Sequence, residues 1–191
     1  VFAYAKSTLN MYGGSITGNS SAGGGGVSVK GTFRMYGGSI TGNRSTDKSG
    51  GGVFISGGGK FVMCGGSITG NSADAEGGGV YANIDPDTGN ASEFIVSGNA
   101  IIADNVKNGE LDSSTGKYTG GTTSNLCLAK HNNTRATITI GEGGLGNNAS
   151  IGVYVEEPAD GVTIATGATA DKNYSGIIVS DNSDYEVAHD S

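Results

Sequence analysis

The sequence is poor in the residues on which several common functions depend. Its 191 residues include two prolines, two cysteines, two histidines and no tryptophan. Eleven Lys and Arg residues stand against 18 Asp and Glu, so no basic stripe is available for a phosphate backbone, and nucleic acid is not an expected partner. No apolar run approaches the length of a membrane span, so we expect no membrane insertion in this segment.

The two cysteines, Cys64 and Cys127, are far apart in the sequence and have no CxxC spacing. This argues against a zinc site, and two thiols do not define a disulfide framework. Because free cysteine is commonly buried, we expect both thiols to be buried or half-buried.

Glycine is present in excess, with 37 residues, against a usual share of about 7%. No G-X-Y period accompanies these glycines, which excludes collagen. The chain has 14 isoleucines and 13 valines against five leucines. Since β-branched side chains pack well on pleated surfaces, this composition predicts an all-β protein.

A repeat accounts for the glycines. The motif GGSITGN occurs three times, with offsets of 24 and 28 residues, and a degenerate copy follows. The copies are Leu9–Asn19, Phe33–Asn43, Phe61–Asn71 and Phe94–Asn105. Three of them precede a glycine run and a short apolar segment, at Val27–Val29, Val53–Ile55 and Val80–Ala82. A period of this length indicates a solenoid.

Each period contains three short apolar runs separated by turn residues, which predicts a parallel β-helix with three short strands per coil, a pectate-lyase-like solenoid. The usual chirality of parallel crossovers predicts a right-handed one. Alternation directs Phe33, Met35, Ile40, Val53 and Ile55 inward and Arg34, Ser39, Thr41, Phe54 and Ser56 outward. Equivalent side chains should then stack about 4.8 Å apart. The expected stacks are Leu9, Phe33, Phe61, Phe94; Ile16, Ile40, Ile68, Ile102; and a structural asparagine ladder of Asn19, Asn43, Asn71, Asn105.

The coils are predicted to span residues 1–159, regular over 1–105 and irregular over 106–159, where a polar insertion interrupts the pattern. Residues 160–191 are expected to cap the open end of the stack. Val1–Tyr4 aligns with Val27–Lys30, so the chain begins partway through a coil, and we expect a monomeric fragment of a longer chain.

The repeats and the closing segments SIGVYVEEPADGVTIATG and SDNSDYEV resemble the β-helical ectodomains of large surface proteins of Gram-positive gut bacteria. The GGSI element is also similar to the GGAI repeat of polymorphic outer-membrane-protein adhesins. The resemblance implies a secreted or cell-surface repeat protein that is adhesin-like. Such a protein takes part in cell adhesion and has no defined biochemical activity. The partner it implies is a glycan or a protein at the cell surface.

Two rows of aromatic residues are candidate ligand-binding surfaces. Phe2, Phe54 and Tyr81 share one outward position, which Ser28 interrupts. Tyr12 and Tyr36 flank the Gly-Gly corner and form a second row, which ends at Cys64. Rings in a row could stack on sugars or contact a protein. The alternative is that they pack under a loop or against a neighbouring domain.

Acidic residues offer candidate metal sites. Asp47 lies on one corner loop, and Asp74 and Glu76 lie on the equivalent loop of the next coil. Asp85 and Asp87 are two apart in a Pro-containing segment, but the EF-hand glutamate is absent, since Val96 occupies its position. Solvated loop charge and a simple turn are the alternatives. We expect no cofactor, with Ca²⁺ left open.

Three functions are therefore compared. The first is a non-enzymatic adhesin-like binding or stalk module, which fits a sequence in which no catalytic set of residues stands out. The second is a carbohydrate-active β-helix enzyme, a polysaccharide lyase or hydrolase, which rests on analogy of fold. The third is an ice- or surface-binding array built on the outward hydroxyl rows Ser15/Thr17, Ser39/Thr41 and Ser67/Thr69, which repeat duplication also explains.

Overall fold

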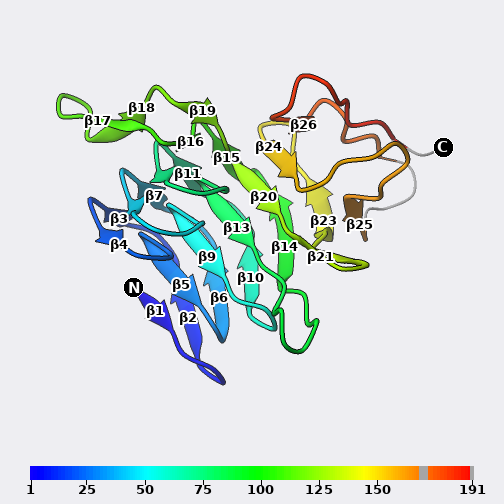
Figure 1. Ribbon diagram of the computed structural model, residues 1–191, viewed down its shortest axis with the longest axis horizontal. Coiled ribbons are helices and arrows are strands. Elements are labelled where there is room, and N and C mark those ends of the chain that lie inside the picture. The colour runs from blue at the N-terminus through cyan, green and yellow to red at the C-terminus, as the bar shows by residue number, and fades with distance from the viewer. Residues whose placement is uncertain (168–171, 190–191) are drawn as a thin grey trace.

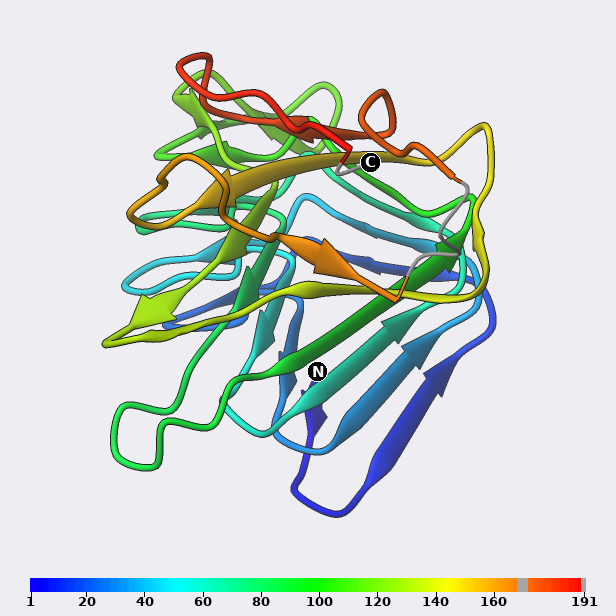
Figure 2. The ribbon, with the colours of Figure 1, turned by 90° about the vertical axis from the view of Figure 1, so that its right-hand side faces the viewer.

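The computed structural model describes residues 1–167 and 172–189 and shows a stack of coils made of short strands (Figure 1). Every regular element within these residues is a strand, and equivalent strands of successive coils pair in parallel. Viewed along its length, the chain winds around a common interior (Figure 2). The prediction of an all-β, parallel β-helix-type solenoid is confirmed, and its right-handed sense stays a prediction.

Three strands of each regular coil occupy the three predicted positions. The first position is the sheet of β2 (Thr8–Met11), β6 (Thr32–Met35), β10 (Lys60–Met63), β14 (Glu93–Gly98), β23 (Ile138–Leu145) and β25 (Ala165–Thr166). The second, after the Gly-Gly corner, holds β3 (Ser15–Thr17), β7 (Ser39–Thr41), β11 (Ser67–Thr69) and β15 (Ile101–Ala103). The third, after the glycine run, holds β1 (Phe2–Ala3), β5 (Val27–Val29), β9 (Val53–Ile55), β13 (Val80–Ala82) and β20 (Leu126–Leu128).

The second and third positions merge at the C-terminal end of the stack. Strand β24 (Ser150–Val155) pairs with β15 through its first two residues and with β20 through Val153–Val155. It has no glycine-rich corner between these two parts, so one continuous strand replaces two separate ones. Strand β26 (Ile178–Ser180) then pairs with β24 in parallel.

A two-residue fourth strand adds to the three expected in each coil. These strands are β4 (Ser20–Ser21), β8 (Arg44–Ser45), β12 (Ser72–Ala73) and β16 (Val106–Lys107), and β19 (Thr122–Thr123) pairs antiparallel with β16. They form because the chain stays in register just after the asparagine corner. There the Arg44 N–H donates to the carbonyl of Asn19, and the Ser72 N–H to that of Asn43, both at 2.9 Å.

The interior is filled by the predicted stacks. Phe33 lies parallel to Phe61, with ring centroids 4.9 Å apart, and Phe61 is tilted against Phe94 at 5.4 Å. The five side chains that alternation directs inward are buried, and the five that it directs outward are half-buried. Of the predicted phenylalanine and isoleucine stacks, the first-coil members Leu9 and Ile16 are only partly buried. The burial of a Leu, Ile or Phe side chain stabilises a fold by about 1.5–3 kcal/mol, and no coil could obtain it alone.

The asparagines form a ladder through the stack. Asn19 donates its backbone N–H and its side-chain Nδ2 to Oδ1 of Asn43, at 3.0 and 2.9 Å. Asn43 donates in the same way to Asn71, and Asn71 to Asn105. All these bonds point toward the C-terminal end, so the ladder has a direction. The last three side chains are fully buried, and the ladder satisfies their polar groups.

The ladder extends beyond the predicted members. Asn105 donates both groups to Oδ1 of Asn125, at 2.9 and 3.2 Å. Asn125 lies opposite Gly79 of the preceding coil, at the end of the glycine run. Its side chain therefore reaches the ladder from the glycine-run position, whereas the other four asparagines lie at the asparagine corner. Asn125 in turn donates to both carboxylate oxygens of Asp181. A carboxylate accepts only, so Asp181 ends the ladder.

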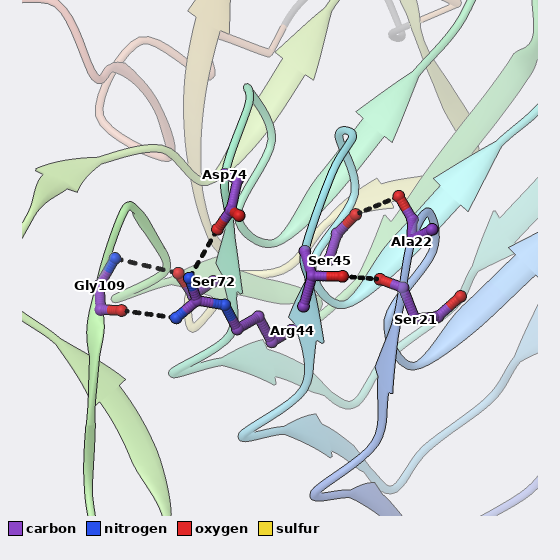
Figure 3. A network of polar contacts seen from close by, with 8 residues as sticks. Ser21, Ala22, Arg44, Ser45, Ser72, Asp74 and Gly109 are labelled. Carbon is purple, nitrogen blue, oxygen red and sulfur yellow. Dashed lines mark hydrogen bonds and ion pairs between the residues drawn. The ribbon is translucent and has the colours of Figure 1, made fainter.

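The polar insertion folds as an antiparallel hairpin of β17 (Glu110–Asp112) and β18 (Lys117–Thr119). Counting coils from the N-terminus, residues 1–26 form coil one and residues 27–52 form coil two. Arg44 from coil two holds the base of the hairpin, as Figure 3 shows. Its guanidinium donates to the carbonyl of Gly109 at 3.2 Å and to Asp74 at 2.7 Å. It also lies 5.7 Å from the Tyr118 ring centroid. The insertion is therefore an ordered addition to the outside of the coils.

The segment after residue 159 packs on the last coil. Strand β25 pairs with β23, β26 pairs with β24, and the buried Tyr174 hydroxyl accepts the Leu145 N–H. Of the predicted cap at 160–191, residues 168–171 and 190–191 lie outside the described residues. A second antiparallel hairpin, β21 (Lys130–His131) and β22 (Thr134–Arg135), precedes β23.

Candidate binding surface

The most exposed aromatic pair is Tyr12 and Tyr36, directly after β2 and β6. Their rings stack in parallel, with centroids 5.0 Å apart and planes 6° apart. Tyr12 is 74% exposed and Tyr36 45% exposed. The register of β2 and β6 brings the two together, because Tyr36 donates its N–H to the carbonyl of Met11. Offset or parallel ring pairs of this kind are worth about 0.5–1.5 kcal/mol beyond their burial.

The same row continues with smaller side chains. Cys64 follows β10 as Tyr36 follows β6, and its N–H donates to the carbonyl of Met35. Among the described residues no aromatic ring stacks on the face of Tyr36 that is turned toward Cys64. The adjoining Gly65 also carries no side chain that would obstruct this face. The tyrosine row therefore ends at Tyr36 in a step, where the smaller side chain of Cys64 takes the place of a ring.

The other predicted row is less open. Phe54 and Tyr81 stack at 5.7 Å with planes 10° apart, and both are half-buried. Glycine turns pack against them, since a Cβ on Gly50 would lie 2.8 Å from the Phe54 Cβ, and one on Gly77 would lie 3.0 Å from the Tyr81 Cβ. Because both rings are half-buried, this pair offers a less accessible surface than Tyr12 and Tyr36.

Phe2 does not belong to this stacked pair. Ser28 pairs with it in register and separates it from Phe54. Its ring instead contacts Tyr4, with centroids 4.5 Å apart, and the Lys30 ammonium lies 5.8 Å from its centroid. Phe2 is 41% exposed and Tyr4 70% exposed. The predicted stripe is thus two separate clusters.

Sequence reasoning missed the continuation of the Phe54 row. Cys127 pairs with Tyr81 in register, and Tyr154 pairs with Cys127. The Glu156 carboxylate is the common hydrogen-bond acceptor at this end of the row. It accepts hydrogen bonds from the Tyr81 hydroxyl and the Lys130 N–H, both at 3.0 Å, and lies 3.8 Å from the Cys127 sulfur. The alignment of Asn125–Leu128 with the GGVY segment would have placed Cys127 in the row, but nothing in the repeat indicates Glu156.

Burial and the neighbouring charge of Glu156 keep the Cys127 thiol and the Tyr81 hydroxyl protonated. Burial, and then the nearby Glu156 carboxylate, raise the pKa of the Cys127 thiol well above its ordinary value of 9.0. The same two causes, in the same order, raise the pKa of the Tyr81 hydroxyl. A neutral, buried thiol is a poor nucleophile and a poor metal ligand, so the cluster is a structural hydrogen-bonded network. Both cysteines are free, and their burial agrees with the prediction.

The acidic corner residues pair with cations of neighbouring coils. Asp74 accepts from Arg44 at 2.7 Å, Glu76 accepts from Lys107, and Asp47 is exposed. Ion pairing and hydrogen bonding with Glu76 raise the pKa of the Lys107 ammonium, the hydrogen bond being the larger cause. The Asp74 and Glu76 carboxylates are thus paired within the fold, whereas the sequence suggested that they lie close to Asp47.

Asp85 and Asp87 lie in a turn. The Asp85 carboxylate accepts the backbone N–H groups of Asp87 and Thr88, at 3.0 and 2.8 Å, and the Thr88 contact is the main reason that its pKa is lowered. This is the side-chain turn that Asp commonly forms. Across the part of the chain that the structure describes, no three His, Cys, Asp or Glu side chains converge as a metal site.

The hydroxyl rows are not uniformly exposed. The insertion hairpin lies over the Thr-Gly-Asn corners, where Tyr118 donates its N–H to the carbonyl of Gly70 at 2.9 Å. The Thr41 hydroxyl is buried without a hydrogen-bond partner among the described residues. A flat array for ice or another surface therefore loses its central rung.

Comparison of the chain with protein-family models, with curated proteins and with solved structures found no match. No helix of the described residues is long and apolar enough to cross a bilayer.

Proposed function

We propose that this chain is a non-enzymatic, adhesin-like module displayed outside the cell, which binds a glycan at the Tyr36 step and serves as a stalk for that contact. The single observation that carries the proposal is the exposed, stacked tyrosine pair that ends at Tyr36. An aromatic ring offers large contact area at low conformational cost, and its face suits the C–H groups of a sugar.

The surroundings of the step favour a bound ring. The Gly-Gly corner beside it leaves the approach clear, because a Cβ on Gly65 would meet only the Tyr36 carbonyl, at 3.2 Å. Tyr12 supports the opposite face of Tyr36 and holds the ring in one orientation. A pre-oriented ring loses little entropy on binding, which favours affinity.

The stalk part of the proposal is supported by the continuity of the stack. Each regular coil is joined to the next by strand pairing at four positions, the fourth being the two-residue strand, and by the asparagine ladder. Two of the three corner carboxylates, those of Asp74 and Glu76, pair with cations of other coils, which supports a structural role for them. Such a stack holds a binding surface at a fixed position along its length.

A glycan array with the intact chain, followed by calorimetry on the strongest binder, tests the proposal. Tyr36→Ala should weaken binding by roughly tenfold, equivalent to about 1.4 kcal/mol, while Tyr36→Phe should retain it. Tyr185→Ala removes a tyrosine of similar exposure in the C-terminal segment and is the matched control. Binding that is unchanged in Tyr36→Ala, or no binding to any glycan, would refute the glycan site.

A further inference from the structure

We propose that the N-terminal edge of the stack, formed by β1, β2, β3 and β4, is a docking surface for one further parallel solenoid coil that carries an asparagine in register. The partner is therefore defined by chemistry, as a coil with the same alternation, Gly-Gly corner and asparagine as this repeat. The proposal does not depend on glycan binding, because it uses the outer face of Tyr12 and leaves the Tyr36 step free.

The asparagine ladder supplies the first argument. In every inner rung, Oδ1 accepts two bonds from the asparagine of the preceding coil, and Nδ2 also donates to an isoleucine carbonyl of that coil. For Asn43 these partners are Asn19 and the Ile16 carbonyl, at 2.9–3.0 Å. Asn19 is exposed, and nothing among residues 1–167 and 172–189 donates to its Oδ1. The Oδ1 atom of Asn19 is thus a free acceptor among the described residues, and an asparagine in a preceding coil would donate to it as Asn19 donates to Asn43.

The apolar stacks supply a second argument. Phe33 and Ile40 are fully buried in coil two, whereas their stacking partners in coil one, Leu9 and Ile16, are only partly buried. They stay accessible because no coil covers them, and burying them would add to the favourable transfer of apolar surface from water. A docking coil with apolar residues at these two positions would extend both stacks.

The corner and the tyrosine row supply a third. Tyr12 is 74% exposed, and the face opposite Tyr36 has no ring partner among the described residues. A Cβ placed on Gly14 would meet nothing within 4 Å, whereas one on Gly38, the same position in coil two, would meet the Gly14 carbonyl at 2.6 Å. Within the described part of the chain, the space beside the Gly14 corner is therefore open. It corresponds to the space beside the Gly38 corner, which coil one occupies.

The direction of the asparagine ladder distinguishes this partner from a second copy of the chain docked head to tail. The C-terminal end of the ladder finishes on the Asp181 carboxylate, which cannot donate to Asn19. That end is also covered by β25 and β26, so it presents no coil edge of the same kind. A partner must bring an amide donor and a parallel strand edge together, and a coil of this repeat does both.

The test adds such a coil to the chain. Residues 27–52 are fused ahead of Val1, so that Gly52 precedes Val1 as Gly26 precedes Val27. Register is favoured at this junction, because the Val1 amino group donates to the Gly26 carbonyl at 2.7 Å and the Val27 N–H donates to the Gly52 carbonyl at 2.8 Å. The control fusion carries Asn43→Leu in the added copy, and a second control carries the same 26 residues in scrambled order.

Amide hydrogen exchange is the readout. By analogy with Tyr36, Ser39 and Arg44, which donate to coil one, the N–H groups of Tyr12, Ser15 and Ser20 should gain partners in the added coil. Their exchange should slow at least tenfold in the fusion, less in the leucine control, and not at all in the scrambled one. Unchanged exchange, with coils two and three still protected, would overturn the proposal.

Two further measurements separate the other outcomes. A synthetic peptide of residues 27–52, added in excess to the unextended chain, should protect the same three amides, which shows docking without a covalent link. Sedimentation of the unextended chain should give a monomer. A dimer that disappears in the fusion would identify a second copy as the occupant and would overturn the assignment to a parallel coil. Glycan binding at Tyr36 should persist in the fusion, so failure of either proposal is recognised independently.

Discussion

Asn125 donates its backbone N–H and its side-chain Nδ2 to the two carboxylate oxygens of Asp181, at 2.6 and 2.8 Å. The two residues are 56 positions apart, and neither belongs to a copy of the repeat. Five asparagines in succession donate toward this one carboxylate. Because an acceptor-only group stands at the end, the ladder finishes without an unpaired donor.

Replacing Asp181 with asparagine should destabilise the chain. The substitution puts an NH₂ group against one of the two Asn125 donors, so one partly buried hydrogen bond is lost and a donor is left unpaired. The expected cost is about 1–3 kcal/mol in the free energy of unfolding, measured by urea denaturation at neutral pH. Asp184→Asn makes the same chemical change at an exposed position and should be nearly neutral. Equal stability of the two variants would contradict the capping role.

Asp181 should also give the stability a pH dependence. Burial raises the pKa of its carboxyl above the ordinary value of 3.8 and outweighs the hydrogen bonds from Asn125, which lower it. The folded state therefore binds this proton more tightly than the unfolded state. Its stabilising contribution is fully present below pH 3.8 and is lost as the pH rises through the folded-state pKa.

The difference in unfolding free energy between the native chain and Asp181→Asn, followed from pH 3.8 to neutrality, isolates this contribution. The native chain should lose stability relative to the variant as the pH rises. A difference that does not change with pH, or that grows in favour of the native chain, would show that the carboxyl pKa is not raised.

An inner rung of the ladder should matter far more than the outer one. Asn71→Ala removes the acceptor of the buried Asn43 N–H and the donor to the Ile40 carbonyl. With about 1–3 kcal/mol for each group left unpaired, the loss should reach about 3 kcal/mol or more. Asn19→Ala, at the exposed end, should cost less than about 1 kcal/mol. Denaturant unfolding of both variants checks this, and similar losses would contradict a buried ladder.

The two thiols should differ in reactivity. The pKa of the Cys127 thiol is raised by burial and by Glu156, and its side chain is fully buried, whereas Cys64 is partly exposed. In the native chain at mildly alkaline pH, a thiol reagent such as Ellman's should react quickly with one group and slowly with the other. In Cys64→Ser the fast phase should vanish. Two fast thiols, or a fast phase that survives in Cys64→Ser, would mean that the Cys127 environment is open.

The repeat made most of the fold predictable because equivalent positions in a stack must meet. The spacing of Phe33 and Phe61 was enough to predict their contact, and that of Asn43 and Asn71 to predict their hydrogen bonds. Alternation within each short strand then separated inner from outer residues. These predictions need only one repeating unit and one translation.

Contacts that depend on residues outside the repeat could not be predicted in this way. Asn125 reaches the ladder from the glycine-run position, and Asp181 closes it from the C-terminal segment. Arg44 binds the insertion hairpin and Asp74 together, which the repeat alone does not indicate. The orientation of the aromatic rings was also beyond the pattern, since register places rings in a row but does not say whether their faces meet.

The pairing of β7 with β11 tests the central claim, that equivalent segments stack in parallel register. Ser39 pairs with Ser67, and both point outward. With both native cysteines replaced by serine, Ser39→Cys with Ser67→Cys places two cysteines on neighbouring strands with their Cα atoms about 4.8 Å apart, inside the span of a disulfide. Ser39→Cys with Thr69→Cys should leave the Cα atoms about 8 Å apart, beyond that span. Mild oxidation followed by mass spectrometry should show a disulfide in the first chain and free thiols in the second, whereas the reverse result would mean antiparallel pairing and would contradict the stack.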